Sequence, residues 1–526
     1  MGCIVYPTNK QGIISNNPEE LKKRVIQPTN SDIRKNYEFI SMLGHGAFGK
    51  VRLYRDRNYK DLLFAIKTLK KEGIPEYQFN LLKSEVSILS NLDHPNIVKY
   101  FGTFEDDYYI HILMEYLKGH DLNKIINLKK YTGFEEKDMS KIIQQLLKAL
   151  SFIHSKGIVH RDIKPDNILF SNKKDYSTLK LIDFGLATTK SDRKSVGTPY
   201  FMSPEMINGD SCPKSDIWSV GIIVYYMLTE KYAFYEKKPN NDHKEHHKNK
   251  EKTLFEKIKK GDYDINPLIE IKCSDEVIDF VKNCLKKSTR ERYDTQQCLN
   301  HAWIKKYDSK NDSNILITKA RDTLLDFVKK TALQKEIYYF IAKISTENDL
   351  AKLKNFFNQL DRRSAGILSI DDIENGFKEI GIKITDSELK LIWEGLDFHK
   401  DGQVNYSEFL AAMISSYHFE KEEKLWSVFN LFKEGNKNKN YITYDSLYNA
   451  AKALNLNINE SEIKKCFEKY DEEIDFETFK KLILDSELED KNFKEGDGIV
   501  RSDVKRRSTR RRTNRSNKSK NIEETK

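Results

Sequence analysis

The sequence predicts an α+β domain followed by an all-α domain. A glycine-rich run at residues 44–51 leads into a strand-like segment at 64–67 and then into a charged amphipathic segment, which is a mixture of strand and helix signals. After Trp303 a polar linker gives way to apolar residues at helical spacing. Four later segments repeat one pattern of helix, polar loop and helix, which indicates a helical domain. A chain of 526 residues is long enough for roughly three domains of ordinary size.

Composition favours a soluble protein that works inside the cell. Hydrophobic residues make up 38% of the chain and charged residues 32%, which suits buried cores. The six cysteines show neither metal-type spacing nor a dense framework, as is typical of a reducing compartment. No apolar run is long enough to span a bilayer, and the N-terminus lacks the apolar core of a secretory signal. We therefore expect a cytoplasmic protein.

The net charge of +10 is concentrated at the C-terminus. Residues 501–526 contain 11 Lys or Arg and 3 Asp or Glu, which leaves the other 500 residues with a charge of only +2. The body of the protein therefore gives no reason to expect specific nucleic-acid binding. We expect residues 486–526 to form a basic disordered tail, which would suit an anionic membrane or nuclear import.

The first residues resemble an acylation signal. Removal of Met1 would expose Gly2 for myristoylation, and Cys3 beside it could take palmitate. Tyr6 departs from the signal, because Ser or Thr is preferred there. We expect residues 1–36 to be an N-terminal arm whose acylation would bring the protein to a membrane surface. The alternative is an unmodified disordered arm.

The strongest local signal is the run HRDIKPDN at residues 160–167, followed by the triplet DFG. Asp162 can orient an attacking hydroxyl and accept its proton, and Lys164 can neutralise charge on the transferred phosphoryl group. Asn167 and Asp183 are hard oxygen ligands suited to magnesium. The spacing of these residues matches the catalytic-loop and metal-loop signatures of protein kinases.

A second motif lies upstream, the run GHGAFGKV that begins at Gly44. Its glycines let the backbone lie close over a triphosphate, where a Cβ would obstruct it. On its own this motif could mark a dinucleotide site. It is followed instead by the strand-like FAIK that ends at Lys67 and then by Glu85, and no acidic residue stands at the spacing of a ribose-binding partner. With all these motifs in order, residues 37–304 resemble a protein kinase domain.

The resemblance implies a two-lobed α+β fold that binds MgATP. Lys67 would hold the α- and β-phosphates, and Glu85 would orient that lysine. The segment LMEYL at 113–117 resembles the hinge between the lobes, whose backbone at Glu115 and Leu117 would hydrogen-bond adenine. The other nucleotide contacts would come from the glycine-rich loop, the apolar sandwich around adenine and one acidic residue, namely Leu43, Gly44, Gly46, Gly49, Val51, Ala65, Leu169 and Asp121.

The same resemblance implies supporting roles for residues further along. Thr198 would brace the catalytic aspartate and lysine, and Asp216 would hold down the catalytic loop. Arg292 would pair with Glu205 in a buried structural ion pair. Lys164 implies a preference for serine and threonine as targets.

Phosphorylation of the activation segment stays open. In the family the residue equivalent to Arg161 usually pairs with a phosphate on this loop, and Ser191 or Ser195 could carry one. Lys194 stands where the phosphorylated residue commonly falls.

Residues 235–252 interrupt the C-terminal lobe with a stretch rich in Lys, Asn, His and Glu. His243, His246 and His247 could form a metal cluster, but a solvated low-complexity insertion is the interpretation that this composition favours.

Beyond the kinase-like region, apolar residues recur at helical spacing with lysines between them. A basic amphipathic helix of this kind is typical of a calcium-sensor target, or of a dimer or core face. We expect residues 305–344 to form an autoinhibitory junction that contains this helix. Its apolar residues are Leu324, Phe327, Val328, Leu333, Ile337, Phe340 and Ile341.

The second of the four later segments comes closest to an EF-hand calcium loop. Such a loop needs oxygen ligands at positions 1, 3, 5, 9 and 12 and glycine at position 6. His399 stands at position 3, where an oxygen ligand is expected. The expected ligands in loop order are Asp397, Asp401, Gln403 through its carbonyl, Asn405 and Glu408, with Gly402 at the turn.

The other three loops are degenerate. The first, residues 361–372, carries Arg363 and Ala365 at positions 3 and 5, where a cation and a methyl group oppose calcium. The third, residues 433–444, lacks the carboxylates at the ligand positions. The fourth begins at Asp471 but reaches the apolar residue of its pairing strand too soon to wrap an ion.

A kinase-like domain, a basic junction and two EF-hand pairs, at 345–416 and 417–485, resemble in this order a calcium-dependent protein kinase of the plant and protist type. The resemblance implies an enzyme that uses ATP, Mg²⁺ and Ca²⁺ to phosphorylate serine or threonine in protein substrates. The junction helix would be the intramolecular partner of the EF-hand domain, and we expect one working calcium site. Asp121 and Asp166 match positions that face a basic residue, which predicts Arg or Lys three residues before the target.

Two other functions remain as alternatives. One is a pseudokinase scaffold that binds nucleotide or calcium without turnover, although the catalytic residues are all present. The other is a kinase that ignores calcium and uses its degenerate EF-hands only for interactions.

Overall fold

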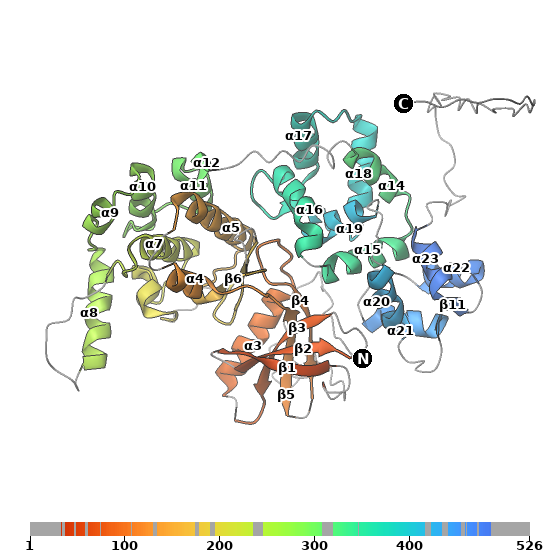
Figure 1. Cartoon of the computed structure of the whole chain (residues 1–526), viewed down its shortest axis with the longest axis horizontal. Helices are drawn as coiled ribbons and strands as arrows, with labels where there is room; N and C mark the ends of the chain where they lie inside the picture. The colour runs from red at the N-terminus through yellow and green to blue at the C-terminus, as the bar shows by residue number, and fades with distance from the viewer. Residues whose placement is uncertain are drawn as a thin grey trace, which may run out of the picture. The chain divides into compact units, whose positions relative to one another are not determined.

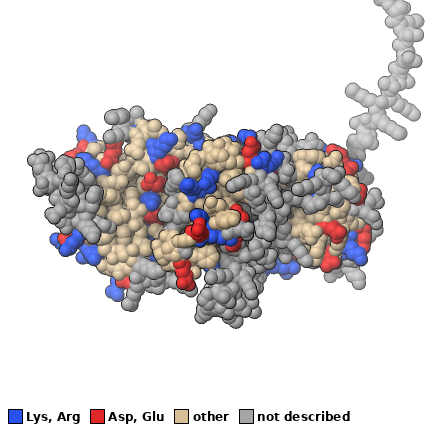
Figure 2. Space-filling model, turned by 90° about the horizontal axis from the view of Figure 1, so that it is seen from below, with Lys and Arg blue, Asp and Glu red and all other residues tan. Residues whose placement is uncertain are grey.

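The computed structural model describes Ile33 and residues 37–484, except for gaps at 47–48, 58–61, 74, 107, 130–133, 174–177, 190–194, 235–245, 308–318, 346, 416–421, 434–439, 454–457, 459 and 471–472. No helix in this described part is long and apolar enough to cross a bilayer. On the face of the molecule shown in Figure 2, basic and acidic side chains lie interspersed, in keeping with the small charge of the body.

A five-stranded antiparallel sheet in the order β1-β2-β3-β5-β4 forms the N-terminal lobe (Figure 1). Its middle strand β3 is buried along nearly its whole length, because the sheet is covered on both faces. Helix α3 (Glu76–Leu89) follows β3 and packs Leu82 and Val86 against apolar residues of the sheet. The strands are β1 (Tyr37–Gly46), β2 (Gly49–Asp56), β3 (Leu63–Lys70), β4 (Tyr100–Glu105) and β5 (Tyr109–Glu115).

The second lobe is mainly helical and contains the largest core of the kinase-like region. Helix α5 (Glu136–Ser155) buries one face, and α7 (Pro213–Thr229) is buried almost all round. A short hairpin of β6 (Ile168–Phe170) and β7 (Leu179–Leu181) follows the catalytic loop. The other helices are α4 (Leu122–Leu128), α6 (Pro204–Ile207), α8 (His246–Lys260), α9 (Asn266–Glu270), α10 (Asp275–Cys284), α11 (Thr295–Leu299) and α12 (Ala302–Lys306), with 3-10 turns η1 (Pro165–Asn167) and η2 (Pro199–Phe201).

The C-terminal half is helical and has a separate apolar core, which confirms the predicted order of an α+β domain and an all-α domain. Two-residue and three-residue strands join its loops in pairs: β8 (Ile367–Leu368) with β9 (Val404–Asn405), and β10 (Tyr441–Thr443) with β11 (Glu473–Asp475). Its helices are α14 (Ala320–Val328), α15 (Ala332–Ile344), α16 (Glu347–Leu360), α17 (Ile370–Ile380), α18 (Asp386–Leu396), α19 (Tyr406–Ile414), α20 (Glu422–Phe432), α21 (Tyr444–Ala453), α22 (Glu460–Tyr470) and α23 (Phe476–Leu484).

The junction consists of two helices, which corrects the single helix expected across the apolar run from Leu324 to Ile341. Helix α14 ends at Val328, and α15 starts anew after Thr331. Thr331 and Gln334 form a capping box, in which each side chain accepts a hydrogen bond from the backbone N–H of the other, and this arrangement fixes a helix start. Both helices bury their apolar faces in the core of the EF-hand domain.

Part of the predicted insertion is helical. Helix α8 begins at His246, so residues 246–252 belong to this helix. His243 lies outside the described residues.

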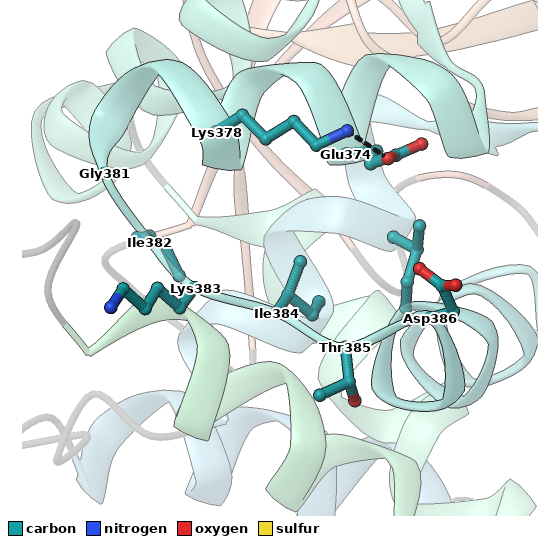
Figure 3. A pocket seen from close by; sticks show the side chains of 9 residues that line it. Glu374, Lys378, Gly381, Ile382, Lys383, Ile384, Thr385 and Asp386 are labelled. Carbon is teal, nitrogen blue, oxygen red and sulfur yellow. Dashed lines mark hydrogen bonds and ion pairs between the residues drawn. The ribbon is translucent and has the colours of Figure 1, made fainter.

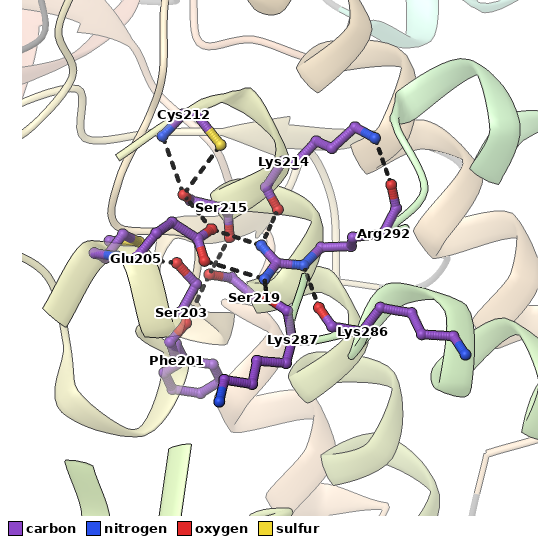
Figure 4. A network of polar contacts seen from close by, with 11 residues as sticks. Phe201, Ser203, Glu205, Cys212, Lys214, Ser215, Ser219, Lys286, Lys287 and Arg292 are labelled. Carbon is purple, nitrogen blue, oxygen red and sulfur yellow. Dashed lines mark hydrogen bonds and ion pairs between the residues drawn. The ribbon is translucent and has the colours of Figure 1, made fainter. Parts of the chain in front are cut away.

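A polar network ties α6 and α7 to the segment before α11 (Figure 4). The buried Arg292 donates to both carboxylate oxygens of Glu205, at 2.6 and 3.1 Å. Ser215 of α7 donates to the same carboxylate at 2.7 Å. Burial opposes the charge of Glu205, but the hydrogen bonds and charge of Arg292 outweigh it and hold the pKa of the carboxyl below its ordinary value.

Arg292→Met should destabilise the kinase domain, because it leaves the Glu205 carboxylate without its counter-ion in a largely buried place. Removal of one partner of a buried pair typically costs about 3–5 kcal/mol of unfolding free energy. Chemical denaturation of the full chain would measure this loss. Lys306→Met is the matched control, since Lys306 pairs with Glu276 on the surface. A loss for Arg292→Met no larger than that of the control would contradict the structural role of the pair.

Candidate active site and calcium loops

A buried ion cluster joins strand β3, helix α3 and the DFG segment. Lys67 Nζ lies 2.6 Å from Glu85 Oε1 and 3.3 Å from Asp183 Oδ1. Burial disfavours the ammonium, but the two carboxylates outweigh this effect and hold the pKa of Lys67 above its ordinary value. The lysine is therefore charged and fixed in place, as a phosphate-binding group must be.

The glycine-rich run forms the turn between β1 and β2. Gly46 pairs with Gly49 across this turn, and Ala47 and Phe48 lie outside the described residues. A Cβ on Gly49 would lie 2.5 Å from the carbonyl oxygen of Thr68 in β3, so only glycine fits there. Gly44 has open space around it, so its lack of a side chain is not a packing requirement.

The residues predicted to sandwich adenine come from both lobes. Ala65 of β3 is buried and pairs with Met114 of β5. Val51 of β2 and Leu169 of β6 are half-buried. Leu43 at the end of the sheet is 42% exposed, and an adenine ring between the lobes would cover apolar surface of this kind.

The predicted hinge begins where β5 ends. The N–H of Glu115 donates to the carbonyl oxygen of Lys99 at 3.0 Å, so its own carbonyl is the backbone group left to meet adenine. The Glu115 carboxylate accepts the N–H of Lys99 at 2.6 Å. Leu117 is buried. Asp121 accepts the N–H of Lys124 at 2.7 Å and so caps helix α4.

The catalytic loop brings its predicted polar residues into one cluster. Thr198 Oγ1 donates to Asp162 Oδ1 at 2.7 Å, and Asn167 Nδ2 donates to Asp162 Oδ2 at 3.0 Å. Lys164 Nζ lies 2.7 Å from Asp162 Oδ2 and donates to Thr198 Oγ1 at 3.0 Å. Both carboxylate oxygens are thus oriented, which a group that aligns a substrate hydroxyl requires.

Asp216 of α7 fixes the backbone before Asp162. Its carboxylate accepts the N–H groups of His160 and Arg161, each at 3.0 Å, and contacts His154 Nε2 at 2.8 Å. Arg161 has a left-handed φ of 67°, a conformation that needs such support in a residue other than glycine. The Arg161 Nε donates to the carbonyl oxygen of Leu186 at 2.7 Å, so this side chain binds the activation segment directly.

Asn167 and Asp183 fit a magnesium site. The hydrogen bonds that the structure gives them involve Asn167 Nδ2 and Asp183 Oδ1, and neither uses Asn167 Oδ1 or Asp183 Oδ2. Lys67 outweighs the effect of burial and holds the pKa of Asp183 below its ordinary value. Two oxygens, one of them anionic, are thus available for a hard cation that also binds nucleotide phosphates.

The second EF-hand loop keeps the expected order of oxygen ligands. Asp397 accepts two backbone N–H groups of its own loop, each at 3.0 Å, and Asp401 accepts the N–H of Gln403 at 3.0 Å. Asn405 and Glu408 accept hydrogen bonds from each other's backbone N–H. These oxygens fit calcium in type and order. The exception is His399, whose Nδ1 lies 2.5 Å from Glu408 Oε1.

His399 is a cation in this loop. Burial lowers its pKa, but the carboxylates of Glu336 and Glu408 beside the ring outweigh burial and raise the pKa to about 9. Within the described residues, no group of three or more His, Cys, Asp or Glu side chains converges as a preformed metal site.

The other three loops either fit calcium less well or are only partly described. In the first, Arg363 occupies position 3 and pairs with Asp372. Most of the third loop and the start of the fourth lie outside the described residues, although Ile442 and Ile474 pair across their short strands. The predicted lipidation sites Gly2 and Cys3 also lie outside the described residues.

A surface hollow of about 590 Å³ lies in the EF-hand domain between α17 and α18 (Figure 3). Lys378 and Lys383 line it, and Lys378 is engaged with Glu374. It contains none of the predicted site residues, so it adds nothing to the catalytic site.

Sequence reasoning missed three charged residues that make long-range contacts. Asp93 and Lys99 of the kinase half contact Ser407 of α19 and the end of α15, and Glu336 of α15 contacts His399 of the second EF-hand loop. No motif in the neighbouring sequence identifies these residues, because the partner of each lies far away in the chain.

Comparison with known proteins agrees with this geometry. A family model described as a protein kinase domain matches residues 37–304, and one described as an EF-hand domain pair matches residues 350–414. Calcium-dependent protein kinase 5 of Plasmodium falciparum is 31% identical over 483 residues, which cover 88% of this chain and 80% of that protein. Calcium-dependent protein kinase 4 of the same organism is 30% identical over 87% of this chain and 88% of its own length. This chain therefore belongs to the calcium-dependent protein kinase family.

Proposed function

We propose that this serine/threonine kinase phosphorylates proteins that carry a basic residue before the target, through the residues assembled around Asp162. The observation that carries the proposal is the complete set of contacts in the active site. The pair of Lys67 and Glu85 is formed, and Asp162 is held by Thr198, Lys164 and Asn167.

We assign one task to each residue of this site. Asp162 orients the substrate hydroxyl and accepts its proton as the oxygen attacks the γ-phosphorus. The bond from that phosphorus to the β-phosphate oxygen breaks, and ADP leaves. Lys67 holds the α- and β-phosphates, and Lys164 offsets charge on the moving phosphoryl group. Magnesium bound at Asn167 and Asp183 would supply positive charge to the phosphate oxygens.

A preference for basic substrates rests on two acidic residues beside the catalytic loop, of which Asp166 is exposed and Asp121 is partly buried. Asp166 accepts a hydrogen bond from Asn123 of α4 at 3.1 Å. Asp121 caps the start of the same helix. The two carboxylates therefore border one surface, where an arginine or lysine of the substrate would find a counter-charge.

Regulation within the chain is supported by two charged contacts between kinase and EF-hand residues. Asp93 accepts the N–H and hydroxyl of Ser407, each at 3.0 Å, at the N-terminus of α19. Lys99 Nζ donates to the carbonyl oxygens of Ala342 and Lys343, at 3.3 and 3.2 Å, at the C-terminus of α15. The helix dipole favours the negative Asp93 at the N-terminus of α19 and the positive Lys99 at the C-terminus of α15.

Lys99 also connects this contact to the hinge. Its backbone N–H donates to the Glu115 carboxylate, and its backbone carbonyl accepts the Glu115 N–H. A change in the position of α15 would therefore act, through Lys99, on Glu115, whose backbone is proposed to bind adenine. This gives the EF-hand domain a direct physical route to the nucleotide site.

Acylation of Gly2 and Cys3 remains part of the proposal. The support is the Met1-Gly2-Cys3 start, which combines the two lipid signals that stable anchoring needs. The protein would then act in the cytoplasm, at a membrane surface.

Asp162→Asn should lower peptide phosphorylation by roughly 10²–10⁴-fold, as expected when a positioned acid–base group is lost. Affinity for MgATP, measured by calorimetry, should stay close to wild type because Asp162 acts on the hydroxyl. Near-normal turnover of the purified variant would show that the assignment is wrong.

Asp166→Asn should weaken the preference for a peptide with arginine three residues before the target over the same peptide with alanine. The expected change in the ratio of kcat/KM values is roughly two- to fivefold, which matches an exposed ion pair. Glu270→Gln, which removes an exposed acid elsewhere in the lobe, is the control. An unchanged ratio in Asp166→Asn would refute the role of this carboxylate.

Lys99→Met should reduce kcat/KM at a fixed calcium concentration by roughly five- to tenfold, near the lower end of the coupling of about 1–3 kcal/mol that is typical between two sites. Lys70→Met, at an exposed lysine of β3 that pairs with Glu72, should have no such effect. Full activity and an unchanged calcium response in Lys99→Met would show that the α15 contact does not influence catalysis.

A further inference from the structure

The first two EF-hand loops share a feature that an ordinary calcium loop lacks. In each, the residue at position 3 is a cation that pairs with the carboxylate at position 12. Arg363 lies 2.7 Å from Asp372 Oδ2 in the first loop, and His399 lies 2.5 Å from Glu408 Oε1 in the second. In a calcium-bound loop the position 12 carboxylate instead binds the ion with both oxygens.

The first loop is closed without a metal ion. Asp361 accepts the N–H groups of Ala365 and Gly366, each at 2.8 Å. Asp372 accepts the N–H and hydroxyl of Ser369 as well as the guanidinium of Arg363. An arginine stays charged at every physiological pH, so a change of pH does not remove this counter-ion.

In this conformation the first loop also packs against the kinase domain. The carbonyl oxygen of Arg363 accepts a hydrogen bond from Gln296 at 2.7 Å. A Cβ on Gly366 would lie 2.4 Å from the ring of His94 and 2.6 Å from that of Phe152. The loop is thus used as a contact surface, and its position 5 residue, Ala365, offers no side-chain oxygen to a cation.

The second loop differs because its cation has two partners. Nδ1 of His399 faces Glu408, and Nε2 lies 3.2 Å from Oε1 of the buried Glu336 on helix α15. A carboxylate beside each ring nitrogen is the arrangement that a doubly protonated histidine prefers. The histidine therefore links the second loop to the junction helix through two ion pairs.

We propose that Arg363 and His399 are internal counter-ions that take the place of calcium in the first EF-hand pair. The first loop binds no calcium. The second binds calcium only after His399 leaves Glu408, so the ion must compete with a side chain of the protein. Binding there also weakens the link between the loop and Glu336, which couples calcium to helix α15.

Calcium titration calorimetry on the full chain tests this competition. His399→Ala removes the competitor without adding a ligand, so calcium should bind about tenfold more tightly than to wild type. Arg363→Ala should not add a binding site, because position 5 of that loop still lacks an oxygen. Lys390→Ala removes one exposed positive charge from the same EF-hand pair and should bind calcium as wild type does.

Unchanged or weaker calcium binding in His399→Ala would overturn the proposal, as would two tight sites in the wild-type first pair. Glu336→Gln provides a second variant that leaves the loop intact. It weakens the hold on His399 and should also tighten calcium binding, by a smaller factor than His399→Ala. An affinity equal to that of wild type in both variants would show that the histidine does not compete with calcium.

Discussion

The active site depends on the buried contact between Lys67 and Glu85. This contact fixes helix α3 relative to strand β3, and the contact of the same lysine with Asp183 fixes the DFG segment. If Glu85 were removed, Lys67 would lose its nearest counter-ion in a site that excludes water, a loss that is strongly destabilising for a charge. The catalytic loop is held separately by Asp216, which supports the left-handed backbone at Arg161.

Neither of these contacts involves the calcium loops or a phosphate on the activation segment. Arg161 binds the Leu186 carbonyl, and the EF-hand domain meets the kinase domain through side chains such as Asp93, Lys99 and Gln296. On the proposal that counter-ions within the first two loops compete with calcium, we expect calcium to adjust the arrangement of the catalytic residues rather than to create it.

The sequence was sufficient to predict the fold order, and it also pointed to the residues that the structure brings together around Asp162. Kinase chemistry needs a few residue types at fixed short spacings, so Asp162, Asn167 and Asp183 were recognisable in the linear chain. The break in the junction was also readable, because Thr331 and Gln334 have the spacing of a capping box. The apolar periodicity across it suggested one continuous helix.

Other features could not be predicted because they join distant parts of the chain. His399 was evident as a departure at position 3, but its contact with Glu336 depends on how α15 packs against α19. Asp93 and Ser407 lie 314 residues apart, and Lys99 caps α15 across a similar separation. Surface charges of this kind look like ordinary solvated residues until the fold brings their partners near.

The most direct measurement is phosphorylation of a basic peptide by the full chain, with calcium and with a calcium chelator. Switching an enzyme from almost fully off to almost fully on requires about 5.5 kcal/mol of differential binding. One weakened calcium site supplies less differential binding free energy, since the coupling between two sites of a protein is typically about 1–3 kcal/mol. The account predicts appreciable activity in the chelator and a rise of several-fold with calcium. Undetectable activity in the chelator, with full activity restored by calcium, would contradict it.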